Sequence, residues 1–138
     1  MKKYIFSLSL LAAVGFVSCN AQNKEETTEQ TEQSTEAGQV INKDVDVAEF
    51  EKLVAAGGGL LLDVRTDGEF ADGHLKGATQ IDYNSPDFQE KIKALNPETP
   101  VYVYCRSGGR SGNAANIMKG MGFKAVYNLE GGIMAWQG

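Results

Sequence analysis

The sequence contains little histidine and cysteine, and it has no excess of positive charge. One histidine and two cysteines among 138 residues are too few for a four-ligand zinc site, which is built mainly from these residue types. Thirteen lysines and arginines against 18 aspartates and glutamates give a formal net charge of -5. Nucleic-acid-binding proteins normally need a net basic surface that displaces counterions. We therefore expect no metal site of this kind and no nucleic-acid partner.

The sequence also lacks an N-terminal apolar run long enough to span a bilayer, which takes about 20 residues. The run at residues 5–17 has 13 residues and follows Lys2 and Lys3, as in a secretory signal peptide. It ends at Phe16-Val17-Ser18-Cys19, which resembles the lipobox of bacterial lipoproteins, although Phe16 stands where leucine is usual.

We therefore expect residues 1–18 to be a signal peptide and Cys19 to be the acylated N-terminus of the mature protein. Acyl chains bury many methylenes and so hold a protein on a membrane without a transmembrane helix. The expected location is the bacterial cell envelope, on the periplasmic or surface side. The alternative is an ordinary cleaved signal peptide with an incidental cysteine.

The composition divides the rest of the chain into a tether and one folded domain. Residues 20–39 contain five glutamates, one lysine and no aromatic or large aliphatic residue. Such a segment cannot bury enough apolar surface to offset its ordering entropy, so the stretch 19–39 is predicted to be an anchor and disordered acidic tether. Residues 40–138 are numerous enough for one modest hydrophobic core.

Apolar patterning in residues 40–138 predicts strands that alternate with helices. The predicted strands are 40–41, 60–64, 80–82, 101–104 and 125–127. The predicted helices follow Asp46, Thr66 and the loop at 105–111, and a further helix is predicted at 88–95, before Pro97. Asp46 with Glu49, and Thr66 with Glu69, have the spacing of capping boxes. The alternation implies an α/β fold with a largely parallel sheet.

The second cysteine lies where an α/β protein usually binds its ligand. Cys105 directly follows the strand 101–104 and opens the sequence CRSGGRS, after which a helix begins. Ligands of open α/β sheets bind outside the carboxyl ends of the strands. Glycines allow successive N–H groups to point inward, a helix N-terminus adds further donors, and arginines offer planar donor forks. The loop is therefore predicted to bind an oxyanion.

The same features favour the thiolate form of Cys105 over the thiol. Cys105 is accordingly a candidate nucleophile, and the alternative is an inert core cysteine followed by a glycine-rich turn. If Cys19 is acylated, Cys105 has no disulfide partner in the chain. A free thiol in an exported protein is unusual, and a functional role would explain it.

At this point the sequence resembles a known family, the single-domain rhodanese-type sulfurtransferases. VYVY followed by CRSGGRS is similar to the family's active-site loop. The residues DVR…EF…GHLKGA at 63–78 are similar to its N-terminal motif, and LEGGIMAW at 129–136 is similar to its C-terminal motif. The three motifs occur in the family order and cover most of the predicted domain.

The resemblance implies a five-stranded, largely parallel sheet with helices on both faces. It also implies that Cys105 takes a sulfane sulfur from thiosulfate or a related persulfide donor and becomes a persulfide. Cyanide, a thiol or a cysteine of another protein would then accept the sulfur. This chemistry needs no metal or organic cofactor, and the protein is expected to be a monomer.

The residues of the loop suggest individual roles in this reaction. The loop amides and Arg110 are expected to hold the anionic donor and the persulfide, whereas Arg106 either binds the donor or faces solvent. Ser111 could cap the following helix. The full predicted binding set is Arg106, Ser107, Gly108, Gly109, Arg110 and Ser111.

Two other functions are compatible with a cysteine loop on this fold. Cysteine-dependent phosphatases and arsenate reductases use a C-x5-R loop, whereas Cys105 to Arg110 is C-x4-R. A shorter ring leaves less room for a tetrahedral oxyanion and still holds one sulfur atom. The other alternative, a non-catalytic binding module, would be signalled by loss of the cysteine, and Cys105 is present.

Several further residues are best interpreted as structural. His74, the only histidine, lies far from Cys105 in sequence and belongs to a structural motif of the family. Asp63 and Arg65 are expected to form a supporting ion pair at the end of a strand. Phe123 and Trp136 are expected to lie in the core.

Overall fold

The computed structural model describes residues 39–136. The predicted signal peptide, Cys19 and residues 20–38 of the predicted tether lie outside this range. The elements in chain order are β1 (Ile41–Val45), α1 (Val47–Ala56), β2 (Leu60–Asp63), α2 (Asp67–Ala71), β3 (Thr79–Gln80), α3 (Phe88–Lys93), β4 (Val101–Tyr104), α4 (Gly109–Gly120), β5 (Ala125–Leu129) and α5 (Gly132–Ala135). The strands form one five-stranded sheet in the order β1-β5-β4-β2-β3, and every pair of neighbours is parallel. The predicted α/β class and parallel sheet are confirmed.

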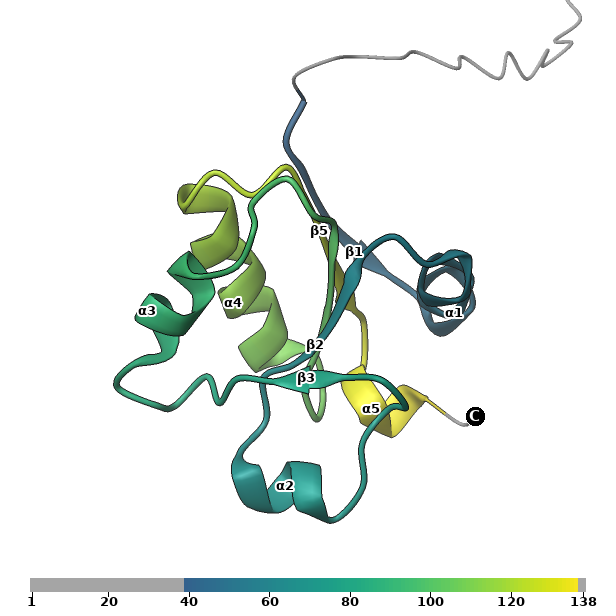
Figure 1. The fold of residues 1–138 in the computed structure, drawn as a ribbon. Coiled ribbons are helices and arrows are strands. Elements are labelled where there is room, and N and C mark those ends of the chain that lie inside the picture. The colour runs from purple at the N-terminus through teal and green to yellow at the C-terminus, as the bar shows by residue number, and fades with distance from the viewer. Residues whose placement is uncertain (1–38, 137–138) are drawn as a thin grey trace, which may run out of the picture. The chain divides into compact units, whose positions relative to one another are not determined.

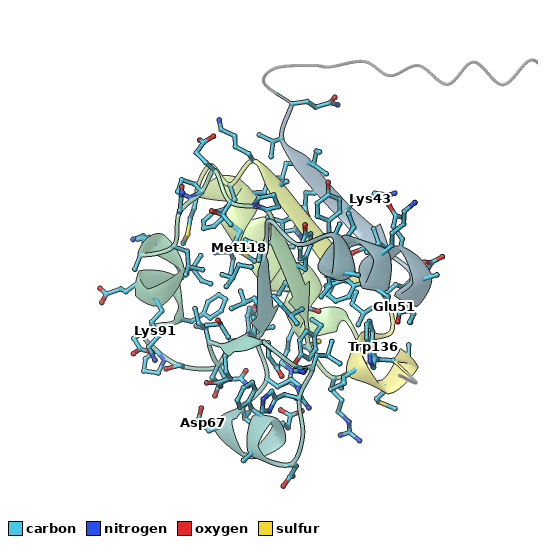
Figure 2. All side chains as sticks on the ribbon, turned by 45° about the vertical axis from the view of Figure 1, so that its right-hand side comes forward. Lys43, Glu51, Asp67, Lys91, Met118 and Trp136 are labelled. Carbon is cyan, nitrogen blue, oxygen red and sulfur yellow. The ribbon has the colours of Figure 1, made fainter. Side chains whose placement is uncertain are left out.

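Helices cover both faces of the sheet, as Figure 1 shows: α3 and α4 lie on one side and α1 and α5 on the other. Successive side chains of a strand point to opposite faces, so each strand contributes to two cores. Leu62 and Val103 pack with Met118 of α4, whereas Leu61 and Tyr102 pack with Phe50 of α1. Met118 and Trp136, which belong to opposite cores, are labelled in Figure 2.

Side-chain caps fix where the first two helices begin. The Asp46 carboxylate accepts a hydrogen bond from the Glu49 amide at 2.8 Å. Thr66 and Glu69 form a full capping box at the start of α2. Both helix starts agree with the prediction, because a cap satisfies orphan N–H groups through residues that are close in sequence.

The element boundaries differ from the predicted ones at several positions. The strand β2 ends at Asp63, β3 covers Thr79–Gln80, α3 ends at Lys93 and α4 already begins at Gly109. The first strand extends over Ile41–Val45 and the last over Ala125–Leu129, both longer than predicted, because the two pair along their whole length. The helix α5, at Gly132–Ala135, was not predicted from the sequence, because four residues are too few to show helical periodicity.

The expected core residues of the C-terminal region are found on both sides of the sheet. Phe123 is 1% exposed. Trp136 is partly buried and packs edge-to-face against Phe50, with ring centroids 6.2 Å apart. Among residues 39–136, no helix is both long and apolar enough to cross a membrane.

Candidate active site at the end of β4

Cys105 is the first residue after β4 and lies at the bottom of a tight loop. Its side chain is 1% exposed. Its Sγ accepts hydrogen bonds from the Gly108 amide at 3.1 Å and from the Ser111 hydroxyl at 3.3 Å. Cys105 belongs to the apolar cluster that contains Val103 and Met118, but two hydrogen-bond donors contact its sulfur. These donors favour a reactive thiol over the inert-cysteine alternative.

These donors shift the ionisation of the thiol. Burial by itself raises the pKa of Cys105. Hydrogen bonds from the Ser111 hydroxyl and from the Ser111, Ser107 and Gly108 amides outweigh burial, and the net pKa lies below its ordinary value. Because donors stabilise the charged form of an acid, the loop favours a thiolate at this position.

Two glycines allow the loop to close tightly around the sulfur. Gly108 has φ +98°, and a Cβ there would lie 3.2 Å from the Gly131 nitrogen. Gly132 has φ +60°, and a Cβ there would lie 2.5 Å from the carbonyl oxygens of Arg106 and Cys105. Only glycine tolerates both this backbone conformation and so close an approach.

The close approach at Gly132 allows backbone amides of α5 to hydrogen-bond to the cysteine loop. The Ile133 amide donates to the Cys105 carbonyl at 2.8 Å, and the Met134 amide donates to the Arg106 carbonyl at 3.1 Å. The family motif at 129–136 therefore supports the site by binding the backbone of the loop. The sequence alone gave no sign of these contacts, because they join two separate loops of the fold.

Arg110 lies in a bidentate ion pair with Glu69 of α2. Nη1 donates to Oε2 at 2.8 Å and Nη2 donates to Oε1 at 2.7 Å, and the two side chains are 26% and 29% exposed. The Arg110 guanidinium lowers the pKa of Glu69 to about 2, against the opposing effect of burial and with help from Thr66. Glu69 in turn raises the pKa of Arg110. The charge of Arg110 is thus shared with a carboxylate that sequence reasoning did not assign to the site.

The other predicted binding residues differ in their exposure. Arg106, Ser107 and Gly109 are exposed, and Gly108 is half-buried. Arg106 lines an open pocket of about 390 Å³. The remaining lining residues of this pocket are Arg65, Glu69, Asp72, Ile133 and Met134.

Ser111 does not cap α4, so that prediction is wrong. The N-cap is Gly108, whose carbonyl accepts the first helical hydrogen bond from the Gly112 amide at 2.9 Å. Ser111 is fully buried within the first turn. Its hydroxyl lies within hydrogen-bonding distance of both Cys105 Sγ and the Gly108 carbonyl, the latter at 3.1 Å. A serine at this position can therefore contact the sulfur directly.

The expected ion pair of Asp63 and Arg65 is present and buried. Arg65 Nη2 donates to Asp63 Oδ2 at 2.7 Å and to the Gly73 carbonyl at 2.7 Å. His74 lies on the same loop, where its Nδ1 is 3.0 Å from the Phe70 carbonyl and its ring stacks on that of Phe70. These contacts hold the loop between α2 and β3 in place, and they agree with a structural role for His74.

The chemistry that this arrangement can support is that of a soft nucleophile next to an anion site. Among residues 39–136, no group of three histidine, cysteine or acidic side chains could bind a metal ion. The sulfur is held at the N-terminus of α4, a helix of 12 residues, where backbone N–H groups favour negative charge. The geometry therefore suits thiolate chemistry with an anionic reactant.

Comparison with known proteins relates this chain to sulfurtransferases. The model of the family described as a rhodanese-like domain matches residues 46–138. A putative sulfurtransferase of Bacillus subtilis, YtwF, is 38% identical over 97 residues, which cover 70% of this chain and 91% of that protein. Thiosulfate sulfurtransferase 18 of Arabidopsis thaliana is 37% identical over 115 residues, covering 75% and 82% respectively. A match to B. subtilis YqhL, 37% identical over 78 residues, covers 56% of this chain and 60% of that protein.

Solved structures give the same relationship at the level of the fold. A rhodanese-like domain protein from Staphylococcus aureus aligns with a TM-score of 0.61 and 28% identity, covering 68% of this chain and 90% of that one. A rhodanese-related protein from Thermoplasma volcanium aligns with a TM-score of 0.60 and 26% identity, covering 68% and 89%.

Proposed function

The chain belongs to the rhodanese-like domain family, and we propose that it is a sulfurtransferase that carries sulfur on Cys105. The observation that carries the proposal is the environment of the sulfur. Cys105 Sγ is buried, accepts hydrogen bonds from Gly108 and Ser111, and has a lowered pKa. Relatives named as sulfurtransferases support the same chemistry.

The proposed reaction has two steps that regenerate the enzyme. The Cys105 thiolate attacks the outer sulfur of thiosulfate, a bond forms between the two sulfurs, and the S–S bond of thiosulfate breaks. Sulfite leaves with the electron pair, and Cys105 holds a persulfide. Cyanide or a thiolate then attacks the outer sulfur of the persulfide, which yields thiocyanate or a new persulfide and restores the Cys105 thiolate. The charges balance in both steps, and the steps need no metal or organic cofactor.

Some loop residues stabilise the Cys105 sulfur in this reaction, and others attract the sulfur donor. The Gly108 amide and the Ser111 hydroxyl stabilise the negative charge on sulfur, because charge-assisted hydrogen bonds are stronger than neutral ones. Arg106 is exposed at the rim of the pocket and attracts the anionic donor. Arg110 adds an electrostatic contribution that its ion pair with Glu69 reduces. The Ser107 amide also helps to lower the pKa of Cys105, and Gly109 is exposed at the start of α4.

Intact-protein mass spectrometry before and after addition of thiosulfate tests the proposal. We expect a mass gain of one sulfur atom that disappears on addition of cyanide. Cys105→Ser should show no gain, and Ser111→Ala should show a slower gain. No gain in the reduced wild-type protein would contradict thiosulfate as donor, and a small-molecule persulfide would then test the broader sulfurtransferase function. If both donors fail, hydrolysis of an aryl phosphate tests the phosphatase alternative.

The proposed location is the bacterial cell envelope, with the domain held by acyl chains on Cys19. Lys2, Lys3, the apolar run at 5–17 and the following cysteine support this proposal. Expression in a bacterial host with radiolabelled palmitate should label the wild-type protein and leave Cys19→Ser unlabelled. Labelling that persists in Cys19→Ser, or an unlabelled wild-type protein, would contradict a lipid anchor.

A further inference from the structure

Asn128 of β5 connects the far edge of the sheet to the cysteine loop. Its side-chain amide is buried, with 5% of the residue exposed. Nδ2 donates to Asp44 Oδ1 at 2.8 Å and to the Gly108 carbonyl at 3.3 Å. Asp44 and Asn128 face each other in the β1–β5 register, so the sheet itself fixes the distance between them.

Gly108 makes hydrogen bonds both to Asn128 and to the Cys105 sulfur. The same residue donates its N–H to Cys105 Sγ and accepts the Asn128 amide at its carbonyl. Gly108 has φ +98°, and glycine alone moves easily among several conformations in this region. The Gly108 carbonyl also accepts the Gly112 amide at 2.9 Å and lies 3.1 Å from the Ser111 hydroxyl. These two contacts come from the first turn of α4, and Asn128 adds a third contact from the sheet. Asn128 therefore orients Gly108 together with α4.

The other half of the Asn128 amide supports the same interpretation. Oδ1 of Asn128 is a buried side-chain oxygen that has no hydrogen-bond partner among the described residues. A buried acceptor without a partner costs stability, and an apolar side chain of similar size would avoid that cost. The two contacts made by Nδ2 therefore explain the asparagine better than packing does.

We propose that Asn128, oriented by Asp44, is a positioning residue that holds Gly108 so that its N–H stays directed at the Cys105 sulfur. Asn128 acts through Gly108 and does not touch the reacting atoms. The inference rests on the proposed function only in taking Cys105 as the nucleophile, and it holds for any reaction of that thiolate.

Several charged groups surround Cys105, and Asn128→Ala leaves all of them in place, whereas the Asp44 variants remove one carboxylate that contacts Asn128. Arg110 of α4 interacts with the Cys105 charge and is paired with Glu69 of α2, and Asp82 acts on Arg110 from beyond β3. The other charged side chains near the loop are the exposed Arg106 and the ion-paired Asp63 and Arg65. A change in thiolate reactivity in an Asn128 variant therefore reports the loss of hydrogen bonding through Gly108.

The test measures how fast iodoacetamide alkylates Cys105 as a function of pH, with the site resolved by peptide mass spectrometry of the full chain. In Asn128→Ala we expect alkylation near pH 6 to be about three- to tenfold slower, the effect of weakening one charge-assisted hydrogen bond. The pH profile should move to higher pH while the rate at high pH stays close to that of the wild type. A merely structural role would not shift the pH profile in this way.

Asp44 and Asn116 provide the second variant and the matched control. Asp44 is exposed, so Asp44→Ala should fold and still show part of the shift, whereas Asp44→Asn keeps an acceptor and should restore most of the wild-type profile. The Asn116 side chain of α4 accepts a hydrogen bond from Asn42 of β1 at 2.9 Å and lines a pocket together with Asp44 and Asn128. Asn116→Ala should leave the profile unchanged.

Two results would overturn the inference. One is a wild-type profile in folded Asn128→Ala or in Asp44→Ala. The other is an equal shift in Asn116→Ala, which would indicate a general loosening of the β1–α4 contact. Alkylation requires no sulfur donor, so a protein that fails to form a persulfide still gives a decisive answer on Asn128.

Discussion

Glu69→Gln isolates the charge of the ion pair between α2 and α4. Glutamine keeps the length of the side chain, and it serves as well as glutamate at the third position of a capping box. The capping contact with Thr66 can therefore persist, while the charge that pairs with Arg110 is removed. The two expected consequences are a loss of stability and a more reactive Cys105.

The loss of stability follows from the pKa of Glu69. That pKa falls from 4.5 to about 2 in the folded protein, and each pH unit of difference corresponds to about 1.4 kcal/mol, which sets an upper limit of about 3 kcal/mol near neutral pH. The pair is roughly one-quarter exposed, and solvent screening reduces the expected loss to about 1–2 kcal/mol.

The lowered pKa of Glu69 also predicts how the loss of stability depends on pH. A carboxylate with a depressed pKa stabilises the fold above its unfolded pKa, and the contribution disappears as pH falls through the folded pKa. The difference in the free energy of unfolding between wild type and Glu69→Gln should therefore be constant above about pH 5. It should fall to about half near pH 3 and approach zero near pH 2.

Urea unfolding followed by circular dichroism at several pH values measures this difference. Thr66→Ala is a useful control, because it removes the cap and leaves the ion pair, and its cost should depend less on pH. In parallel, the unpaired Arg110 should speed alkylation of Cys105 near pH 6. A difference between wild type and Glu69→Gln that is the same at pH 7 and pH 3 would refute the reasoning.

Two further substitutions test the cysteine loop and its support by α5, and a third serves as a control. Ser111→Ala should slow alkylation of Cys105 near pH 6 by about tenfold at most, because it removes one hydrogen bond to a charged group; a rate equal to that of the wild type would contradict this role. Gly132→Ala should destabilise the domain by about 3 kcal/mol or more in urea unfolding, because its Cβ would lie 2.5 Å from the Arg106 and Cys105 carbonyl oxygens. Gly58→Ala, where φ is +80° but space is open, should cost only about 1 kcal/mol, and equal costs at the two glycines would refute the steric argument.

The predictable parts of the fold depend on residues close in sequence. The helix starts at Asp46 and Thr66 were predicted because each cap closes within three residues. The strands at the centre of the sheet were predicted because buried parallel strands are continuous apolar runs. The position of Cys105 at the carboxyl end of β4 follows from the same two signals.

The unpredicted parts of the site depend on residues far apart in sequence. Glu69 and Arg110 are separated by 41 positions, and no local pattern marks them as partners. Asn128 lies in β5, a strand that is recognised from its apolar residues. Its contact partner Asp44 is 84 positions away in the sequence. Ser111 was given the wrong role because serine before a helix is usually a cap, whereas the loop here places a glycine in that position.

The pairing of Arg110 also bears on how the proposed sulfur transfer would be driven. The donors that stabilise the Cys105 sulfur are backbone amides and the Ser111 hydroxyl, and Arg110 of α4 shares its charge with Glu69. Fixed dipoles of this kind stabilise a charge without reorganising during the reaction. In the proposed reaction the sulfur is a monoanion both as thiolate and as persulfide, so the same donors serve both states. An unpaired guanidinium close to the sulfur would also bind the departing sulfite. Under the proposed function, the exposed Arg106 would attract the donor at the rim of the pocket without holding the product at the sulfur.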